Sequence, residues 1–168
     1  EISCSLVGSE MCIRDRLYDG ELTVDVDYTQ TELEVGIKAG RLMFHNVSGD
    51  IRILEDVNSL VTLSDTKGTV FQSNQTVRVC DQIANDVAVL FHTRYLGTVP
   101  NDAAGRVSLW NDICKIHQNL ETLRAIEDFD TESVTVGEGD TKRSVVCMVS
   151  NLNIVNAMSQ LYMSVIIQ

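Results

Sequence analysis

Two long stretches with a helical repeat of apolar residues, separated by a short connector, constrain the fold of this chain most. In residues 74–95 apolar side chains recur every three or four positions, at Val77, Cys80, Ile83, Ala84, Val87, Leu90 and Phe91. This spacing predicts an amphipathic helix with Asn74 as its N-cap, about 33 Å long at ~1.5 Å per residue. Gly97 is expected to end the helix.

A second amphipathic helix is predicted for residues 102–123, after a connector at residues 98–101 that contains the single proline of the chain. Its apolar stripe consists of Val107, Trp110, Ile113, Cys114, His117, Leu120 and Leu123. Because the connector is so short, the two helices are expected to pack antiparallel.

The segment before this helix pair predicts a short helix followed by a hairpin. Thr29 and Glu32 have the spacing of a capping box, and Gly40 lies where a C-terminal cap belongs, so residues 29–39 predict a helix. Residues 41–47 and 51–57 have strand composition, and the turn residues 48–50 between them predict a β-hairpin.

After Phe129 the apolar repeat changes to two, which predicts strands at residues 133–136, 144–149 and 161–167. The element order is therefore α-ββ-α-α-βββ. We expect an α+β fold in which the two long antiparallel helices pack on one face of a largely antiparallel sheet.

Charge and hydropathy exclude two classes of partner. The 168 residues, about one domain, include 13 Lys and Arg against 24 Asp and Glu, which gives a formal net charge of −11. A nucleic-acid partner is not expected, because phosphate backbones are bound by basic surfaces. A membrane partner is not expected either, since no run of about 18 apolar residues is present.

Neither the histidines nor the cysteines form a pattern typical of a catalytic or metal site. His45, His92 and His117 lie in different predicted elements without an HExxH motif, and the five cysteines (4, 12, 80, 114 and 147) lack a CxxC pair. Glycine-rich phosphate-binding and nucleophile-elbow motifs are also missing. We therefore predict no catalytic residues, metal or cofactor; a metal-dependent or thiol enzyme that uses these histidines and cysteines is the alternative.

The last predicted strand has an unusual composition. Residues 161–167 are apolar on both faces and include no charge, whereas exposed edge strands are normally protected by Lys, Pro or a bulge. Such a strand is expected to be covered, either within its own sheet or by a sheet of another copy, to which it would add main-chain hydrogen bonds. The residues alone leave both alternatives open.

The N-terminal segment is expected to be foreign to the fold. Residues 5–16, SLVGSEMCIRDR, resemble a translated adapter that precedes unrelated reading frames in assembled environmental sequence, so residues 1–16 are interpreted as a non-native leader. Residues 17–28 are interpreted as a linker from an upstream domain, and residues 29–168 as the domain proper.

Five ordered stretches resemble the C-terminal domain of contractile tail sheath proteins, in particular those of myovirus-type phages and prophages of Gram-positive hosts. The stretches are IKAGRLMF (37–44), VRVCDQIANDVAVLF (77–91), YLGTVPNDAAGR (95–106), RAIEDFD (124–130) and VNAMSQLYMSV (155–165).

The resemblance implies a structural subunit that polymerises as hexameric rings into a helical sheath around the tail tube and contracts to drive the tube through the host envelope. Its partners are other copies of itself and the tube protein, and its location is the virion tail, after assembly in the host cytoplasm. The sheath of a tailocin or other contractile injection system is the alternative, and a soluble adaptor domain that binds a peptide strand is one of a different class.

The resemblance also implies site residues. The donor strand inserted into a neighbouring subunit consists of Leu161, Tyr162, Met163, Val165 and Ile167, and the acceptor is the sheet formed by residues 41–47, 51–57 and 144–149. Basic residues on the helices are candidates for contact with the tube, namely Arg94, Arg106 and Lys115.

Overall fold

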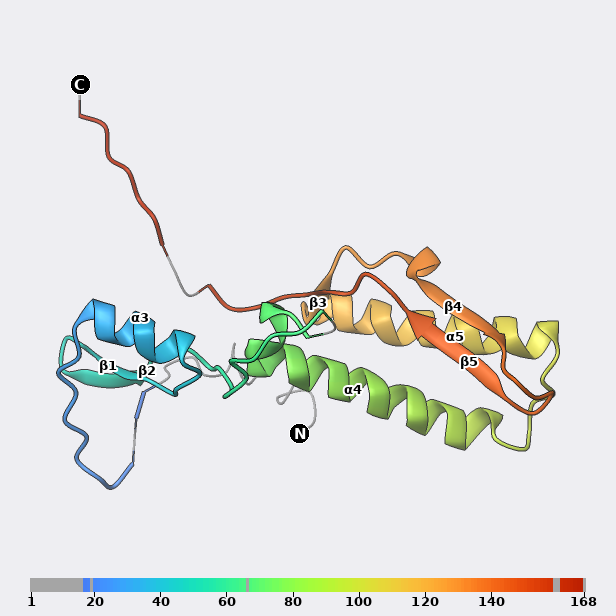
Figure 1. The fold of residues 1–168 in the computed structure, drawn as a ribbon. Helices are drawn as coiled ribbons and strands as arrows, with labels where there is room; N and C mark the ends of the chain where they lie inside the picture. Colours follow the sequence, from blue (N-terminus) through green and yellow to red (C-terminus); the bar gives the residue numbers. More distant parts are fainter. Residues whose placement is uncertain (1–16, 19, 66, 159–160, 168) are drawn as a thin grey trace. The chain divides into compact units, whose positions relative to one another are not determined.

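The structure is a computed structural model that describes residues 17–18, 20–65, 67–158 and 161–167 (Figure 1). The predicted leader at residues 1–16 lies outside the described residues. The chain divides into two compact units. The terminal unit consists of the described residues up to Val77 together with those from Asn156 onward, and the helical unit consists of Arg78–Val155.

The elements follow one another in an α+β order. They are α3 (Gln30–Lys38), β1 (Phe44–Val47), β2 (Asp50–Ile53), η1 (Thr69–Gln72), α4 (Asn74–Leu90), η2 (Phe91–Tyr95), α5 (Ala103–Thr122), β3 (Ile126–Glu127), η3 (Thr131–Ser133), β4 (Val134–Glu138), β5 (Val145–Val149) and β6 (Asn153–Ile154). Among the described residues, none of the helices combines the length and apolar character needed to span a bilayer.

In the terminal unit, the predicted helix and hairpin are present, with strands shorter than the predicted residues 41–47 and 51–57. α3 begins with the expected capping box, in which the Glu32 amide donates to the Thr29 hydroxyl and the Thr29 amide donates to the Glu32 carboxylate. Gly40 follows with a φ of +67°, a left-handed conformation that favours glycine. β1 and β2 pair antiparallel from Phe44↔Ile53 to Val47↔Asp50, around Ser48 and Gly49.

The outer edge of β2 is partly covered by the start of the described chain. Leu17 forms an antiparallel bridge with Arg52, and the Tyr18 amide donates to the Ile51 carbonyl at 2.7 Å. The Tyr18 ring also lies edge-to-face on Phe44, with the ring centroids 5.7 Å apart. Residues 17–18 therefore cover part of the β2 edge through an isolated bridge.

The two long helices lie where the apolar repeats place them. α4 continues into the π-helical turn η2, so that the helical run ends at Tyr95 as expected. α5 begins after Asp102, whose side chain accepts a hydrogen bond from the Gly105 amide at 2.7 Å. At the start of α4, the Asn74 amide group donates to Asp56 at 2.6 Å, which ties the helix to the segment after β2.

One hydrophobic core joins the end of α4, α5 and the β4–β5 hairpin. Its buried residues are Tyr95, Leu109, Ile113, Cys114 and Val134. Partly buried residues from the end of α4 and from both strands pack against them: Val87, Leu90, Phe91, Val136, Val145 and Val149. The hairpin lies along α5 (Figure 1).

The Trp110 indole also donates a 2.9 Å hydrogen bond to the Val134 carbonyl, which joins α5 to β4. This packing confirms helices on one face of antiparallel strands.

The strands differ from the expectation in how they are grouped. In the described part of the chain they form three separate two-stranded antiparallel sheets, β1–β2, β3–β6 and β4–β5, rather than one sheet. The physical reason is that alternation of apolar residues identifies a strand but not its partner, and the two hairpins lie in different units. The β3–β6 pair is only two residues long and has no periodicity to detect.

The strand predicted at residues 161–167 is not formed within the described chain, where this segment has no regular structure. Of the two alternatives for this segment, pairing within a sheet of its own chain is not observed among the described residues. An extended segment needs an edge to pair with, and none of the three sheets includes it.

Candidate assembly site

The C-terminal arm, residues 161–167, is the most exposed apolar segment of the described chain. The five predicted donor residues range in exposure from 72% for Val165 to 90% for Ile167. The arm contains no charged residue, Gly or Pro. An uncharged segment of this length with high β-propensity is strongly prone to pair with other strands when exposed. The apolar side chains of the arm are therefore expected to be covered by another surface.

The β4–β5 hairpin provides an edge on which such a segment could pair. Because this sheet has two strands, each strand has an outer edge with no neighbouring strand in the described part of the chain. On β4, the Val134 carbonyl accepts the bond from Trp110. On β5, no backbone hydrogen bond joins Val145–Val149 to the backbone of another described segment outside the hairpin. β5 is therefore the more available edge.

The outer face of β5 is apolar as well. Val145 and Val149 pack toward the core, whereas Val146 and Met148 are exposed by 56% and 59%. An incoming strand would place its own alternate side chains beside these two. The β1–β2 hairpin also belongs to the predicted acceptor. Its β2 edge is less available for pairing, because Leu17 and Tyr18 already occupy part of it.

Two of the three predicted tube-facing residues converge on one carboxylate. Arg94 from η2 and Lys115 from α5 contact the two oxygens of Asp112 at 2.9 and 3.1 Å. The Tyr95 hydroxyl donates to the same carboxylate at 2.9 Å. Both basic side chains are more than 60% exposed, while Asp112 is 14% exposed.

Asp112 is held as an anion by these contacts. Burial alone would raise its pKa, but the hydrogen bonds from Tyr95 and Lys115 and the charges of Lys115 and Arg94 outweigh burial, so the pKa of Asp112 lies below its ordinary value. Burial also raises the pKa of Tyr95. The cluster thus presents two exposed cations around one fixed carboxylate.

Arg106, the third predicted residue, lies in a different setting. Its guanidinium contacts Glu138 at 3.1 Å and the side-chain oxygen of Asn101 at 3.2 Å. Asn101 in turn donates to the carbonyls of Lys142 and Ser144, which joins the helix connector to the β4–β5 turn. The structure therefore brings Arg94 and Lys115 together but places Arg106 in contacts that stabilise the fold.

Asp112 and Asn101 were not singled out by the sequence. The spacing of Asp112 and Lys115 is a weak helical pairing signal. Arg94 contacts Asp112 across the connector because of how the two helices pack, and no sequence pattern predicts this contact.

The three histidines and the described cysteines, Cys80, Cys114 and Cys147, do not assemble into a site. His117 is fully buried, where Nδ1 contacts the Ile113 carbonyl at 2.9 Å and the ring stacks on Phe129. His45 lies in β1 and His92 in the π-helical turn. Within the described ranges, no group of three His, Cys, Asp or Glu residues is arranged to hold a metal ion.

The cysteines of the helical unit are free thiols. Burial raises the pKa of Cys80, Cys114 and Cys147, so their reactive thiolate forms are disfavoured.

Comparison with known proteins decides what kind of domain this is. A family model described as the phage tail sheath C-terminal domain matches residues 66–168, more than half of the chain. The chain belongs to this family. The matched range includes α4, α5, β4, β5 and the C-terminal arm of the sheath domain.

Two proteins that the sheath domain is similar to are themselves named as tail sheath proteins. Over 81 residues the chain is 36% identical to the tail sheath protein of Clostridium phage phiCD119, an alignment that covers 48% of the chain and 22% of that protein. The sheath tail protein of Desulfitobacterium hafniense is 28% identical with a TM-score of 0.64, over 72% of this chain and 28% of that one. The chain therefore spans less than a third of the length of these two relatives.

Two further structures share the fold. They are the sheath tail protein of Listeria innocua (23% identity, TM-score 0.71, 84% of this chain and 34% of that one) and a chain of the anti-feeding prophage baseplate (13% identity, TM-score 0.71, 99% and 49%). At these identities the likeness concerns the fold alone. The resemblance noted in the sequence is thus confirmed at the level of the family.

Proposed function

We propose that this sheath domain is part of a structural subunit that polymerises as hexameric rings around a tail tube and contracts to drive the tube through the host envelope. Membership of the tail sheath family supports this proposal. The observation that carries it is the uncharged, exposed C-terminal arm in a domain whose β5 edge is unpaired by any other described strand.

In this proposal the arm of one subunit pairs with the β5 edge of a neighbour. Each added main-chain hydrogen bond contributes about 0.5–1.5 kcal/mol, and each fully buried Leu or Ile side chain about 1.5–3 kcal/mol. Leu161, Met163, Val165 and Ile167 alternate with Tyr162 and Ser164, so one face of the arm would cover the core side and the other the outer face. In this position the apolar side chains of the arm would no longer be exposed to solvent.

A contact of this kind is heterologous, because the arm and the acceptor edge are different surfaces. Repeated from copy to copy, it yields rings or helical arrays rather than a closed dimer. An exchanged arm would keep subunits linked while their packing changes, which suits contraction as a switch between two arrangements.

The tube contact is proposed for the Arg94 and Lys115 side of the helical unit. Two cations around the Asp112 anion leave a local charge of +2 − 1 = +1, so this site retains attraction for an acidic partner. Exposed ion pairs of this kind are worth about 0–1 kcal/mol, weak enough to be broken during contraction. Arg106 is the weaker candidate, because its charge is balanced by Glu138.

The remaining parts of the proposal rest on the charge of the chain and on its membership of the tail sheath family. The net charge of −11 disfavours nucleic acid as a direct partner. The proposed location is the virion tail, after assembly in the host cytoplasm, and the proposed role involves neither catalysis nor a cofactor.

Deletion of residues 161–168 tests this function. In electron micrographs of the sheath protein that contains this domain, assembled with tube, the unmodified protein is expected to form hollow striated cylinders and the deleted protein only short or isolated rings. Val35→Lys, which places a charge on an exposed apolar position of α3, is the control and should assemble normally. Full-length cylinders from the deleted protein would show that strand exchange is not the linkage.

A contractile injection system, such as a tailocin, is the second candidate. The fold shared with a chain of the anti-feeding prophage baseplate favours it as an alternative, since the fold does not separate the two machines. Capsid and terminase genes beside the coding sequence would indicate a phage, and their absence a tailocin. A strand-binding adaptor would bind an added peptide but would not form cylinders.

A further inference from the structure

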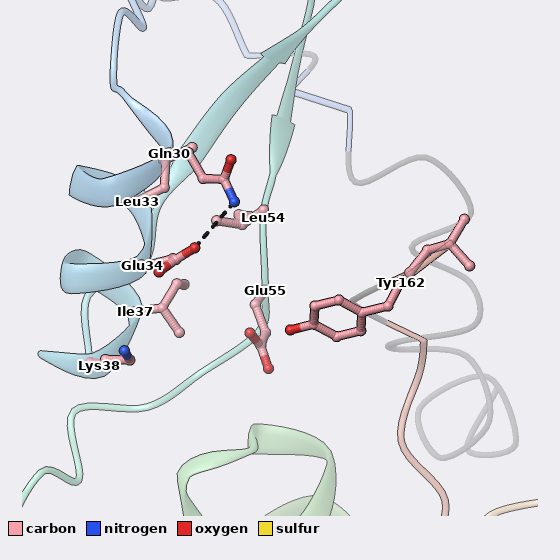
Figure 2. A pocket seen from close by; sticks show the side chains of 9 residues that line it. Gln30, Leu33, Glu34, Ile37, Lys38, Leu54, Glu55 and Tyr162 are labelled. Atoms are coloured by element: carbon pink, nitrogen blue, oxygen red, sulfur yellow. Dashed lines mark hydrogen bonds between the residues drawn. The ribbon is translucent and has the colours of Figure 1, made fainter. Parts of the chain in front are cut away.

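The terminal unit contains a hollow between α3 and the end of the β1–β2 hairpin, shown in Figure 2. Its volume is about 590 Å³, within the ~300–1,000 Å³ range of pockets that bind ligands. Half-buried apolar side chains, Leu33 and Ile37 from α3 and Leu54 after β2, form its walls. Polar residues Gln30, Glu34, Lys38 and Glu55 surround them.

The C-terminal arm itself contributes to the rim of this hollow. Leu161 and Tyr162 belong to the residues that line it, and Figure 2 shows the Tyr162 hydroxyl directed toward the Glu55 side chain. Both arm residues remain 89% exposed, so the arm stands at the opening and the hollow is not filled.

The attachment of the arm explains why it lies there. The Ser73 hydroxyl donates to the Asn156 side chain at 3.0 Å, and Ser73 is bridged to Val57. Val57 is two residues from Glu55, which lines the hollow. Six extended residues from Asn156 to Tyr162 span up to about 20 Å. The chain is therefore anchored beside the hollow and is long enough to enter it.

We propose that in the unassembled subunit the hollow between α3 and β2 holds the chain's own arm, residues 161–167, and so withholds it from neighbouring subunits. The arm has the matching chemistry, because it is uncharged and apolar, with one tyrosine hydroxyl to face the polar rim. A tethered segment of this length acts at an effective concentration in the millimolar range, which favours the arm over a free peptide or a second copy.

The consequence for assembly rests on the proposed function. An arm held in its own hollow competes with donation to the β5 edge of a neighbour, so release of the arm would precede polymerisation. The hollow then delays assembly until a growing sheath offers a β5 edge that binds the arm more tightly than the hollow does.

A photo-crosslinking experiment on the whole chain tests the contact. Tyr162 is replaced by p-benzoylphenylalanine, unlabelled and ¹⁵N-labelled chains are mixed at low concentration, and the adducts are identified by mass spectrometry after irradiation. We expect adducts to peptides containing residues 30–38 or 54–55, with both halves of each adduct carrying the same isotope label. Adducts between differently labelled chains, which would place the arm of a second copy there, adducts elsewhere, or none would overturn the proposal.

Variants of the hollow separate a specific contact from chance proximity. Ile37→Asp and, on the opposite wall, Leu54→Asp each place a charge in the hollow and should lower the adduct yield about tenfold. Val35→Asp is the matched control, because Val35 lies on the same helix but does not line the hollow. Unchanged adduct yields in both hollow variants, with the helical content intact, would refute the proposed contact between the arm and the hollow.

The assembly kinetics then distinguish this inference from the proposed function. If both hold, Ile37→Asp shortens the lag before sheath formation. If the adduct forms in the expected place but no variant assembles, the proposed function fails while the contact stands.

Discussion

At the scale of single residues, Asp112 is the most connected charge of the helical unit. It accepts bonds from the buried Tyr95 hydroxyl, from Arg94 and from Lys115, so one carboxylate links η2 to α5. The pairs with Arg94 and Lys115 are exposed on the cation side and are worth little individually. The bond from Tyr95 matters more for stability, because its loss leaves a buried hydroxyl with one partner fewer.

Asp112→Asn is expected to lower the free energy of unfolding at pH 7 by about 1–2 kcal/mol, since charge-assisted bonds become neutral ones. The folded-state pKa of Asp112 is lowered, so its contribution is present above the ordinary value of 3.8 and is lost as the pH falls through the folded-state pKa. Denaturant titrations at pH 7 and pH 3 should therefore show a smaller difference between the two proteins at the lower pH. A difference that grows on acidification would contradict this role.

A second prediction concerns two glycines in helices. Replacing a helical glycine by alanine normally stabilises a protein by about 0.5–1 kcal/mol. At Gly105, however, a Cβ would collide with the backbone carbonyl of Pro100, so Gly105→Ala should be destabilising. At Gly36 the Cβ would meet the flexible side chain of Met43, which can move, so Gly36→Ala should cost less. Thermal unfolding of both variants checks the order, and the reverse order would refute it.

At the scale of elements, what the sequence could predict depended on the length of each repeat. The apolar positions from Val77 to Phe91 repeat over four turns and defined α4 with its continuation, and Asp102 marked the start of α5. Sheet partners could not be predicted, because the alternation in residues 144–149 does not specify that Cys147 faces Val136. The Asp112 cluster was missed for a similar reason, since Arg94 and Asp112 meet only through the packing of two helices.

The outer face of β5 gives a prediction at this scale. Met148→Lys places a charge where the arm of a neighbour is proposed to pack, so it should weaken self-association at least about tenfold. Because Met148 is 59% exposed, the stability of the single chain should change by no more than about 0.5 kcal/mol. Sedimentation velocity measures the association, with Val35→Lys as the control. Equal association of the two variants would exclude the β5 face.

At the scale of the whole molecule, the net charge of −11 opposes association of identical copies. A sheath domain that assembles through apolar strands and main-chain bonds must overcome this repulsion, which salt screens over about 10 Å at 0.1 M. Self-association should therefore strengthen as NaCl is raised from about 20 mM to 200 mM. Light scattering over that range shows whether self-association rises or falls with NaCl. Self-association that weakens with salt would instead indicate that ion pairs between copies hold the assembly.

In the proposed assembly, the arm at residues 161–167 becomes a strand on the β5 edge of another copy. Amide hydrogen exchange of the whole chain, followed by mass spectrometry as its concentration is raised, tests this most directly. We predict that amides of residues 161–167 and of Val145–Val149 become protected together as copies associate. Association that leaves the amides of the arm as unprotected as in the single chain would contradict the claim.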